Sequence, residues 1–312
     1  MKLSIVTTLY LSAPYVAEFH RRVSDAARKI TDDYEIVMVD DGSPDNSLAI
    51  AMELVDRDPK LRIVELSRNY GHHKAMITGL EHTGGDYVFL IDVDLEEPPE
   101  LLDGFFEEMR ASGCDVVYGF QSARKGNWFE RHSGALAWRL INLFLAIQIP
   151  HNHSTVRLMT RAYAQALVQH KEQKTAIGGL WVITGFRQKG TEFVKASRGR
   201  GSYTFPRRLG ALLDSVTSFS EIPLFMVFFA GLLILVMSLT VAAGLVILRI
   251  AGTVLEGWIS VMISVWLLGG LAIFCIGVVG LYVSRIFIET KGRPYTIIRQ
   301  MHQYMPKNER KS

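Results

Sequence analysis

The chain has 312 residues, a formal net charge of +3 at pH 7 and a hydrophobic content of 49%. Its mean hydropathy of +0.17 is high for a soluble protein, and the apolar excess is concentrated in the last third of the sequence. The modest net charge argues against nucleic acid as a partner, and two distant cysteines, Cys114 and Cys275, predict neither a disulfide nor a metal site.

Apolar runs alternate with amphipathic stretches through the first 120 residues. The runs have strand length, and the stretches between them have helical spacing, as in residues 14–30. We expect strands at 2–10, 61–67, 86–94 and 114–120, and a further strand within 34–47 that ends in acidic residues and a turn. Helices are expected at 14–30, 46–57, 72–83 and 98–113. This alternation predicts an α/β fold with a mostly parallel sheet and helices on both faces, whose ligands bind beyond the carboxyl ends of the strands.

Residues 128–149 combine aromatic and aliphatic side chains with Arg131, Arg139 and Asn142. Such a pattern is typical of a helix that lies in a membrane interface, and equally of an amphipathic helix that packs on the rest of the domain. The sequence leaves both interpretations open.

Two stretches without charge, 223–248 and 257–284, are each longer than the roughly 20 residues that cross a bilayer. Buried helices of a soluble core are the alternative, which the lack of any polar stripe disfavours. Because the link 249–257 is short, we expect a hairpin of two membrane helices. Three parts follow: a catalytic domain at 1–220, the hairpin at 221–286 and a basic tail at 287–312.

Basic residues concentrate outside the hairpin rather than in its link. Arginines and lysines precede the first span and follow the second, whereas the link holds only Arg249 and Glu256. The positive-inside rule then places the catalytic domain and both termini in the cytoplasm, on a multi-pass protein of the inner membrane. The start of the chain runs directly into a strand, so we expect no signal peptide. Membrane lipid is an expected partner of the basic residues.

Asp92 and Asp94 follow the fourth predicted strand. In extended geometry their side chains point the same way while Val93 points into the core. Two carboxylates at a sheet edge suit a hard divalent cation that also binds substrate phosphates. We interpret the nearby Glu96, Glu97 and Glu100 as residues that favour the start of the next helix.

Asp40 and Asp41 end the second predicted strand in the same manner. Gly42 and Ser43 permit a tight turn, and a carboxylate there can accept hydrogen bonds from a base or ribose. Asp45 or Asn46 is expected to cap the following helix. His72 and His73 diverge at a helix start, so we interpret them as polar helix-start residues and a poor metal pair.

Several motifs together resemble a known family. IVTTLY, VDDGSPDNS, SRNYGHHKAMITGL, DYVFLIDVDLEEPPELL and VRLMTRAY, followed by SYTFPRRLGALLDSVTSFSEIPL and two apolar spans, are similar to membrane-anchored family 2 glycosyltransferases that act on polyprenyl phosphates. Dolichyl-phosphate mannose synthase and bacterial undecaprenyl-phosphate glucosyltransferases are of this type. The resemblance covers nearly the whole chain and implies a GT-A fold, a nucleotide-sugar donor, Mg²⁺ or Mn²⁺, and a polyprenyl-phosphate acceptor.

The resemblance also implies roles for particular residues. Asp92 and Asp94 would be the metal-binding and catalytic pair. The donor site would comprise Thr8, Tyr10, Asp40, Asp41, Gly42, Ser43, Lys74, Asp92 and Val93. Arg131 and Arg198 would act in catalysis, within an acceptor-phosphate set of Arg124, Arg131, Arg157, Arg198, Arg200 and Ser202.

The sequence departs from the family pattern at three places. Tyr10 is followed by Leu11 and Ser12 instead of Asn-Glu. Ser154 and Thr155 replace the acid that often precedes Arg-Leu-Met, and Gly-His-His-Lys stands where Gly-Lys-Gly is common.

The acceptor's chemistry indicates a mechanism. A phosphate monoester has a second pKa near 6 and needs no general base to attack the anomeric carbon. It needs cations that position it beside an acidic metal site, for which arginine is well suited. Attack opposite the leaving group would invert the anomeric centre.

Other functions remain alternatives. A processive polysaccharide synthase would carry a Gln-x-x-Arg-Trp motif, which the sequence lacks. A membrane scaffold that binds a nucleotide sugar without turnover is disfavoured by the intact Asp92 and Asp94, and a channel by the lack of charge within the spans. Another lipid or glycan acceptor is a further alternative. UDP-glucose is our expected donor by analogy, while the sugar, UDP against GDP, and a dimeric or tetrameric state stay open.

Overall fold

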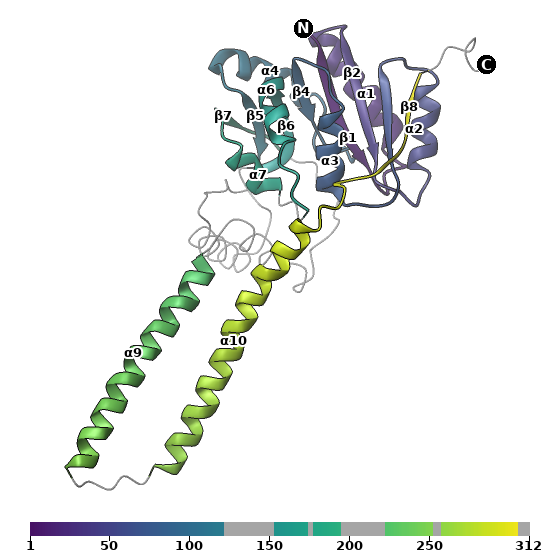
Figure 1. Cartoon of the computed structure of the whole chain (residues 1–312). Coiled ribbons are helices and arrows are strands. Elements are labelled where there is room, and N and C mark those ends of the chain that lie inside the picture. The colour runs from purple at the N-terminus through teal and green to yellow at the C-terminus, as the bar shows by residue number, and fades with distance from the viewer. Residues whose placement is uncertain (122–152, 174–176, 195–221, 252–256, 305–312) are drawn as a thin grey trace. The chain divides into compact units, whose positions relative to one another are not determined.

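The computed structural model describes residues 1–121, 153–173, 177–194, 222–251 and 257–304 (Figure 1). Its described residues fall into two compact parts. Those up to 194, together with those from Arg293 onward, form what we call the sheet unit. Those from 222 to Gly292 form the helical unit.

An eight-stranded sheet organises the described part of the sheet unit. Its strands are β1 (Leu3–Leu9), β2 (Tyr34–Asp40), β3 (Leu61–Leu66), β4 (Tyr87–Leu90), β5 (Val116–Phe120), β6 (His153–Thr160), β7 (Gln188–Glu192) and β8 (Ile298–Gln303). They lie in the order β7-β5-β6-β4-β1-β2-β3-β8. Neighbours β1–β2, β1–β4, β2–β3 and β5–β7 are parallel, whereas β6 and β8 pair antiparallel with their neighbours.

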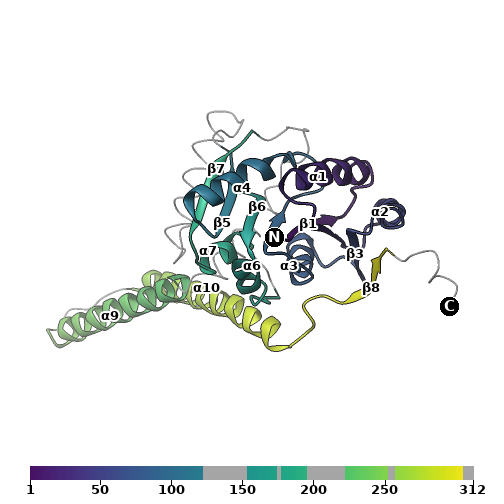
Figure 2. The same cartoon turned by 90° about the horizontal axis from the view of Figure 1, so that it is seen from above.

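Helices cover both faces of this sheet (Figure 2). One layer contains α1 (Val16–Ile30), α2 (Ser47–Val55) and α4 (Leu101–Ser112). The opposite layer contains α3 (His72–Glu81), α6 (Arg161–Leu167) and α7 (Ile177–Ile183). The predicted α/β fold with a mostly parallel sheet and two helical layers is therefore confirmed.

The central strands are buried on both faces, which explains their continuous apolar sequences. Every residue of β1 and β2 is buried. On one side α3 packs closely through Gly79, where an added Cβ would lie 2.6 Å from Val6 Cγ1 and 2.9 Å from Val39 Cγ2. Glycine is required at this position because the helix backbone lies directly on the strands.

The helical unit consists of two long helices, α9 (Ile222–Ile250) and α10 (Trp258–Thr290). Within the described residues one stretch, Leu267–Thr290, is long and apolar enough to cross a membrane, and a shorter apolar stretch covers Ile222–Ile234. Large apolar side chains such as Phe229, Ile273 and Phe274 are exposed along both helices. Apolar surface of this extent requires an apolar environment or a partner.

The sheet differs from the sequence prediction at the end of β4 and in three strands that were not predicted, β6, β7 and β8. The fourth strand was expected to run through Asp94, but β4 ends at Leu90. Its pairing with β1 ends at Val6 opposite Leu90, and one further bond from Ile91 N to Val6 O closes the ladder before the chain turns. In the expected basic tail, β8 extends the sheet along the free edge of β3.

Candidate functional site

Polar side chains meet at the carboxyl edge of the central strands. Leu9 at the end of β1 lies opposite Asp40 at the end of β2, and β4 runs parallel to β1 on its other side. Thr8, Asp40, Asp41 and Asp92 therefore come from neighbouring strand ends. This is the edge at which open α/β sheets bind ligands.

The turn after β2 is fixed by bonds to the end of β1. Asp41 N donates to Leu9 O at 3.0 Å, and Leu11 N donates to Ser43 Oγ at 2.9 Å. Gly42 has a φ of +64°, in the left-handed region that favours glycine. Tyr10 beside this turn is 46% exposed, so its ring is available to a ligand.

Asp41 joins this turn to the start of α3. Its carboxylate accepts hydrogen bonds from Tyr70 N at 2.7 Å and Gly71 N at 3.0 Å. Gly71 precedes the first residue of α3, so the carboxylate satisfies backbone donors at a helix start. Asp41 thus shapes the loop that leads into His72.

His72 connects two of the strand ends. The Thr8 hydroxyl is hydrogen-bonded to His72 Nδ1 at 2.9 Å, and His72 Nε2 lies 3.3 Å from Asp92 Oδ1. Burial alone would lower the pKa of His72, but the contact with Asp92 and the charges of Asp92, Asp41 and Asp94 raise it above its ordinary value of 6.5. His72 thus lies in the combined negative field of these three carboxylates.

The sequence identified His72 only as a helix-start residue, and the contact with Asp92 was missed. Since α3 starts at the carboxyl edge of β3, its first residue faces the ends of the adjacent strands. The place of His72 after a parallel strand was the available signal.

Asp92 and Asp94 lie in a turn instead of an extended strand. Val93 is buried in the core and both aspartates are half-buried. Asp94 Oδ1 accepts a hydrogen bond from Glu96 N at 3.0 Å, and Leu95 has a positive φ of 59°. The predicted burial of Val93 is confirmed, but the extended geometry predicted for the two aspartates is wrong.

The glutamates of this loop have different environments. Glu100 directly precedes α4 and forms a two-bond ion pair with Arg22, with nitrogen-to-oxygen distances of 2.9 and 2.6 Å. Glu97 is 1% exposed and accepts a hydrogen bond from Ser154 on β6. The interpretation as helix-start residues fits Glu100 and is wrong for Glu97, which ties the loop to β6.

The described residues contain no group of three or more His, Cys, Asp or Glu side chains arranged to hold a metal ion. Asp92 and Asp94 alone provide half-buried carboxylates on one loop. Such a pair fits Mg²⁺ or Mn²⁺, because Mg²⁺ usually takes one or two carboxylates and completes its shell with water and substrate phosphates.

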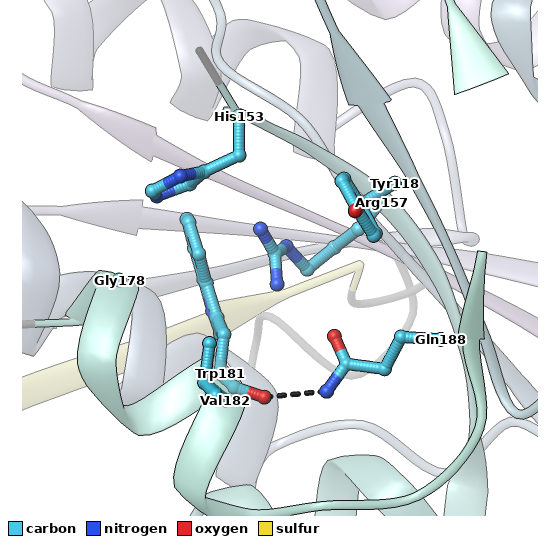
Figure 3. Close-up of a pocket in the computed structure, with 7 residues that line it drawn as sticks. All are labelled: Tyr118, His153, Arg157, Gly178, Trp181, Val182 and Gln188. Atoms are coloured by element: carbon cyan, nitrogen blue, oxygen red, sulfur yellow. Dashed lines mark hydrogen bonds between the residues drawn. The ribbon is translucent and has the colours of Figure 1, made fainter. Parts of the chain in front are cut away.

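A small pocket, with a cavity volume of about 20 Å³, lies on the α7 side of the sheet (Figure 3). It is lined by Tyr118, His153, Arg157, Gly178, Trp181, Val182 and Gln188. The guanidinium of Arg157 lies 3.0 Å from the centre of the Trp181 ring, and its nitrogens donate to Ser154 O and Thr155 O at 3.2 Å. Burial lowers the pKa of Arg157 to about 9, so the group stays cationic at neutral pH.

The register of β4 and β6 relates this pocket to the aspartates. Arg157 pairs with Leu90, two residues before Asp92. Trp181 was not singled out from the sequence, because nothing in its local pattern links it to Arg157.

The remaining predicted residues fall into two groups. The ammonium of Lys74 donates to Gln173 Oε1 and Tyr295 O, at 2.9 and 3.3 Å. Outside the described residues lie the expected helix at 128–149 and the other members of the acceptor-phosphate set: Arg124, Arg131, Arg198, Arg200 and Ser202.

Replacing Asp40 with Asn is expected to raise the thermal midpoint at pH 7.5. Burial raises the pKa of Asp40 from 3.8 to about 6. The folded state therefore holds this proton more tightly than the unfolded chain, and the stability of the wild type falls as pH rises from about 4 to 6. Asn avoids that loss, so the difference in midpoint should be present above pH 6 and vanish below pH 4.

Asp45, five residues further on, provides a control of opposite sign. Its carboxylate accepts hydrogen bonds from Ser43 Oγ, Ser47 N and Ala13 N, which overcome the effect of burial and lower its pKa to about 2. The N-cap of α2 is Asn46, whose side chain makes no capping bond, so the expected cap is not formed and Asp45 instead binds the amide of Ser47, the first helical residue. Asp45→Asn should lower the midpoint at pH 7.5. Equal shifts in both variants would contradict the assigned environments.

The family profile described as glycosyl transferase family 2 matches residues 4–168, more than half of the chain. The chain is a family 2 glycosyltransferase. This assignment confirms the resemblance noted in the sequence, and with the sheet described above it identifies a GT-A-like Rossmann fold. The matched region contains Thr8, Asp41, His72 and Asp92.

Curated relatives align with this family 2 glycosyltransferase over nearly its whole length. A Mycobacterium tuberculosis protein named as a glycosyltransferase is 52% identical over 303 residues, covering 97% of this chain and 89% of its own. A prophage-derived bactoprenol glucosyl transferase of Shigella flexneri is 30% identical over 310 residues, covering 98% of this chain and 100% of its own.

Solved structures are more distant. Mannosyl-3-phosphoglycerate synthase from Rubrobacter xylanophilus is 16% identical with a TM-score of 0.46, covering 69% of this chain and 72% of its own. Glucosyl-3-phosphoglycerate synthase from Mycobacterium tuberculosis, in complex with Mn²⁺, UDP and glucosyl-3-phosphoglycerate, is 20% identical with a TM-score of 0.44, covering 68% and 75%.

Proposed function

We propose that this glycosyltransferase moves a sugar from a nucleotide sugar, with UDP-glucose as the first candidate, to a membrane polyprenyl phosphate. The observation that carries the proposal is the convergence of Asp41, Asp92 and Asp94 around His72 at the carboxyl edge of the sheet. The acceptor is inferred from the aligned bactoprenol glucosyl transferase and from the apolar helices of the chain.

Asp92 and Asp94 are our candidates for holding Mg²⁺ or Mn²⁺. A divalent ion there would neutralise charge that develops on the departing nucleoside diphosphate. Asp92 is also in contact with His72, so its carboxylate keeps one orientation. The turn that Asp94 closes on Glu96 N fixes the second carboxylate in the same manner.

The nucleoside would occupy the ends of β1 and β2. Tyr10 offers an exposed ring on which a base can stack, and the buried carboxylate of Asp40 would accept a hydrogen bond from a base N–H or ribose hydroxyl. A donor from the ligand would favour the ionised form of Asp40, which burial opposes. Gly42 and Ser43 give the turn after β2 its shape, Thr8 bonds His72, and Val93 is buried in the core between the two aspartates.

The transfer step needs no deprotonation of the acceptor. A phosphate monoester is largely a dianion at neutral pH, so its oxygen attacks the anomeric carbon as the bond from that carbon to the nucleoside diphosphate breaks. Attack from the opposite side inverts the anomeric centre. The electron pair of the broken bond stays on the diphosphate, and no oxidant or proton donor is required.

Arginines would neutralise the acceptor phosphate. Arg131 and Arg198 are our first candidates, with Arg124, Arg200 and Ser202 as further contacts. Arg157 is buried under Trp181, so we assign it to the floor of the pocket, where its charge acts on an incoming phosphate without free movement. Anchoring by a two-helix hairpin in the inner membrane, with a cytoplasmic catalytic domain, would bring these residues to the lipid headgroups.

A transfer assay tests the proposal. Detergent-solubilised protein would receive undecaprenyl phosphate, Mg²⁺ or Mn²⁺ and a panel of UDP- and GDP-sugars, and the lipid fraction would be examined by mass spectrometry. We expect a sugar-phosphate lipid from one donor, with product formation lost on chelation and restored by adding the metal back.

The other outcomes separate the alternatives. Nucleotide release without a modified lipid would indicate another acceptor. Donor binding by calorimetry without any turnover would favour a scaffold that only binds the nucleotide sugar. Product formation that persists after chelation would contradict the metal assignment.

A further inference from the structure

The chain that follows α10 returns to the sheet unit and contacts α3. β8 pairs with β3, and Ser67 N donates to Ile297 O at 2.9 Å. Tyr295, ahead of β8, is 8% exposed. We call residues 293–297 the return segment. Its contacts join α3 to a segment more than 200 residues later in the chain.

A small polar junction joins the return segment to the first turn of α3. Lys74 Nζ donates to Gln173 Oε1 at 2.9 Å and to Tyr295 O at 3.3 Å. Gln173 Nε2 in turn donates to Arg293 O at 2.7 Å. Gln173 therefore bridges the lysine and the return segment.

One helical turn further along α3, a second contact supports the same arrangement. Thr78 Oγ1 and Thr296 Oγ1 are hydrogen-bonded at 2.8 Å. Residues four apart lie on one face of a helix. Lys74 and Thr78 therefore present one face of α3 to the return segment.

The opposite side of this turn holds the acidic site. Gly71 N is bound by Asp41, and the side chain of His72 contacts Thr8 and Asp92. Gly71 at the N-cap provides no side-chain cap, so the position of the first turn depends on these tertiary contacts. The turn is thus held from the site on one side and from the return segment on the other.

We propose that Lys74 is a positioning residue. Through its hydrogen bonds to Gln173 and to the return segment that follows α10, it fixes the start of α3 and thereby holds His72 beside Asp92. This inference rests on the proposed function, since it assigns Asp92 to the metal and diphosphate. It differs from direct donor binding by Lys74, in which the ammonium itself would contact the diphosphate.

Calorimetry of the full-length, detergent-solubilised protein tests this assignment, with UDP and Mn²⁺ as probes. Lys74→Met and Gln173→Leu should each weaken Mn²⁺-dependent UDP binding by about tenfold, the usual scale for residues that orient metal ligands. Binding of UDP without Mn²⁺ should be unchanged, which a general loss of structure would not produce. Lys74→Arg, which keeps the donors, should restore part of the affinity.

Lys171→Met is the matched control. Lys171 contacts α3 at its other end, through a 2.7 Å ion pair with Glu81, the last residue of the helix. It should leave Mn²⁺-dependent binding within twofold of wild type. An effect equal to that of Lys74→Met would overturn the inference, because any loosening of α3 would then suffice.

Gln173→Leu separates positioning from direct contact. A loss in Lys74→Met that Gln173→Leu does not reproduce would mean that Lys74 contacts the diphosphate itself, and would overturn the inference. Unchanged binding in both variants would also overturn it while the proposed function stands. Failure of the wild-type protein to bind UDP with Mn²⁺ would instead refute the proposed function and this inference together.

Discussion

Replacing Asp94 with Asn is expected to reduce sugar transfer by on the order of 10³-fold while leaving the fold intact. A bound divalent ion contributes several kcal/mol to the stabilisation of developing charge, and each factor of ten in rate corresponds to about 1.4 kcal/mol. Asn keeps the shape of the side chain and can still accept the hydrogen bond from Glu96 N, so the turn should survive. The change therefore removes charge from the site with little change in structure.

Two measurements distinguish this result from unfolding. The thermal midpoint of Asp94→Asn should remain within a few degrees of wild type, and its Mn²⁺-dependent UDP binding should be lost. Glu100→Gln is a control from the same acidic stretch, because Glu100 pairs with Arg22 and is exposed. It should retain activity within about twofold, as is usual for a surface ion pair. Full activity in Asp94→Asn would refute the metal assignment.

The fold was predictable where the sequence carries regular hydrophobic patterns. The strands β1 to β5 are short apolar runs, and α1 shows a regular apolar face with Val16, Phe19 and Val23 buried. β8 was not predicted because its side chains are mostly exposed on an edge strand. Its pairing with β3 follows from a chain reversal that local pattern does not encode.

The sequence predicted which acidic residues belong to the site but not the hydrogen bonds that those residues make. Asp40, Asp41, Asp92 and Asp94 were found because acids at the end of an apolar strand conflict with burial and call for a partner. The role of Asp41 in holding Gly71, and that of His72 beside Asp92, depend on hydrogen bonds between residues 30 and 20 positions apart in the chain. Such contacts follow from the packing of α3 on the sheet, which Gly79 permits.

The environment of Glu97 and the stacking of Arg157 on Trp181 were likewise not predictable from the local sequence, because both depend on contacts between distant parts of the chain. A surface helix start and a buried bond to Ser154 are both compatible with the local sequence around Glu97. Only the antiparallel pairing of β6 with β4 brings Ser154 to this loop. Long-range strand order therefore decides which of several acidic residues become buried.

Gly42→Ala is expected to destabilise the protein by roughly 3 kcal/mol and to weaken Mn²⁺-dependent UDP binding at least about tenfold. The positive φ costs an L-residue about 1 kcal/mol or more, and overpacking adds about 1–3 kcal/mol. The added Cβ would lie 2.6 Å from both Arg68 C and Asn69 N. These are backbone atoms, so no side-chain rotation relieves the overlap.

The effect on UDP binding follows from the residues that come after Arg68 and Asn69 in the chain. Displacement of residues 68 and 69 moves Tyr70 and Gly71, whose amides are bound by Asp41, and Gly71 leads directly into His72. One methyl group at the turn after β2 should therefore disturb the site around Asp92 through the loop before α3. Thermal unfolding and calorimetry with UDP and Mn²⁺ measure the two consequences separately.

Gly113→Ala isolates the contribution of backbone strain. Gly113 ends α4 with a φ of +61°, close to that of Gly42, but an added Cβ there would meet nothing within 4 Å. It should cost about 1 kcal/mol and leave UDP binding unchanged. Gly42→Ala could instead lose as little stability and UDP binding as Gly113→Ala. The loop before α3 would then move without cost to accommodate the added methyl group, and the connection from Asp41 to His72 would not determine the geometry of the site.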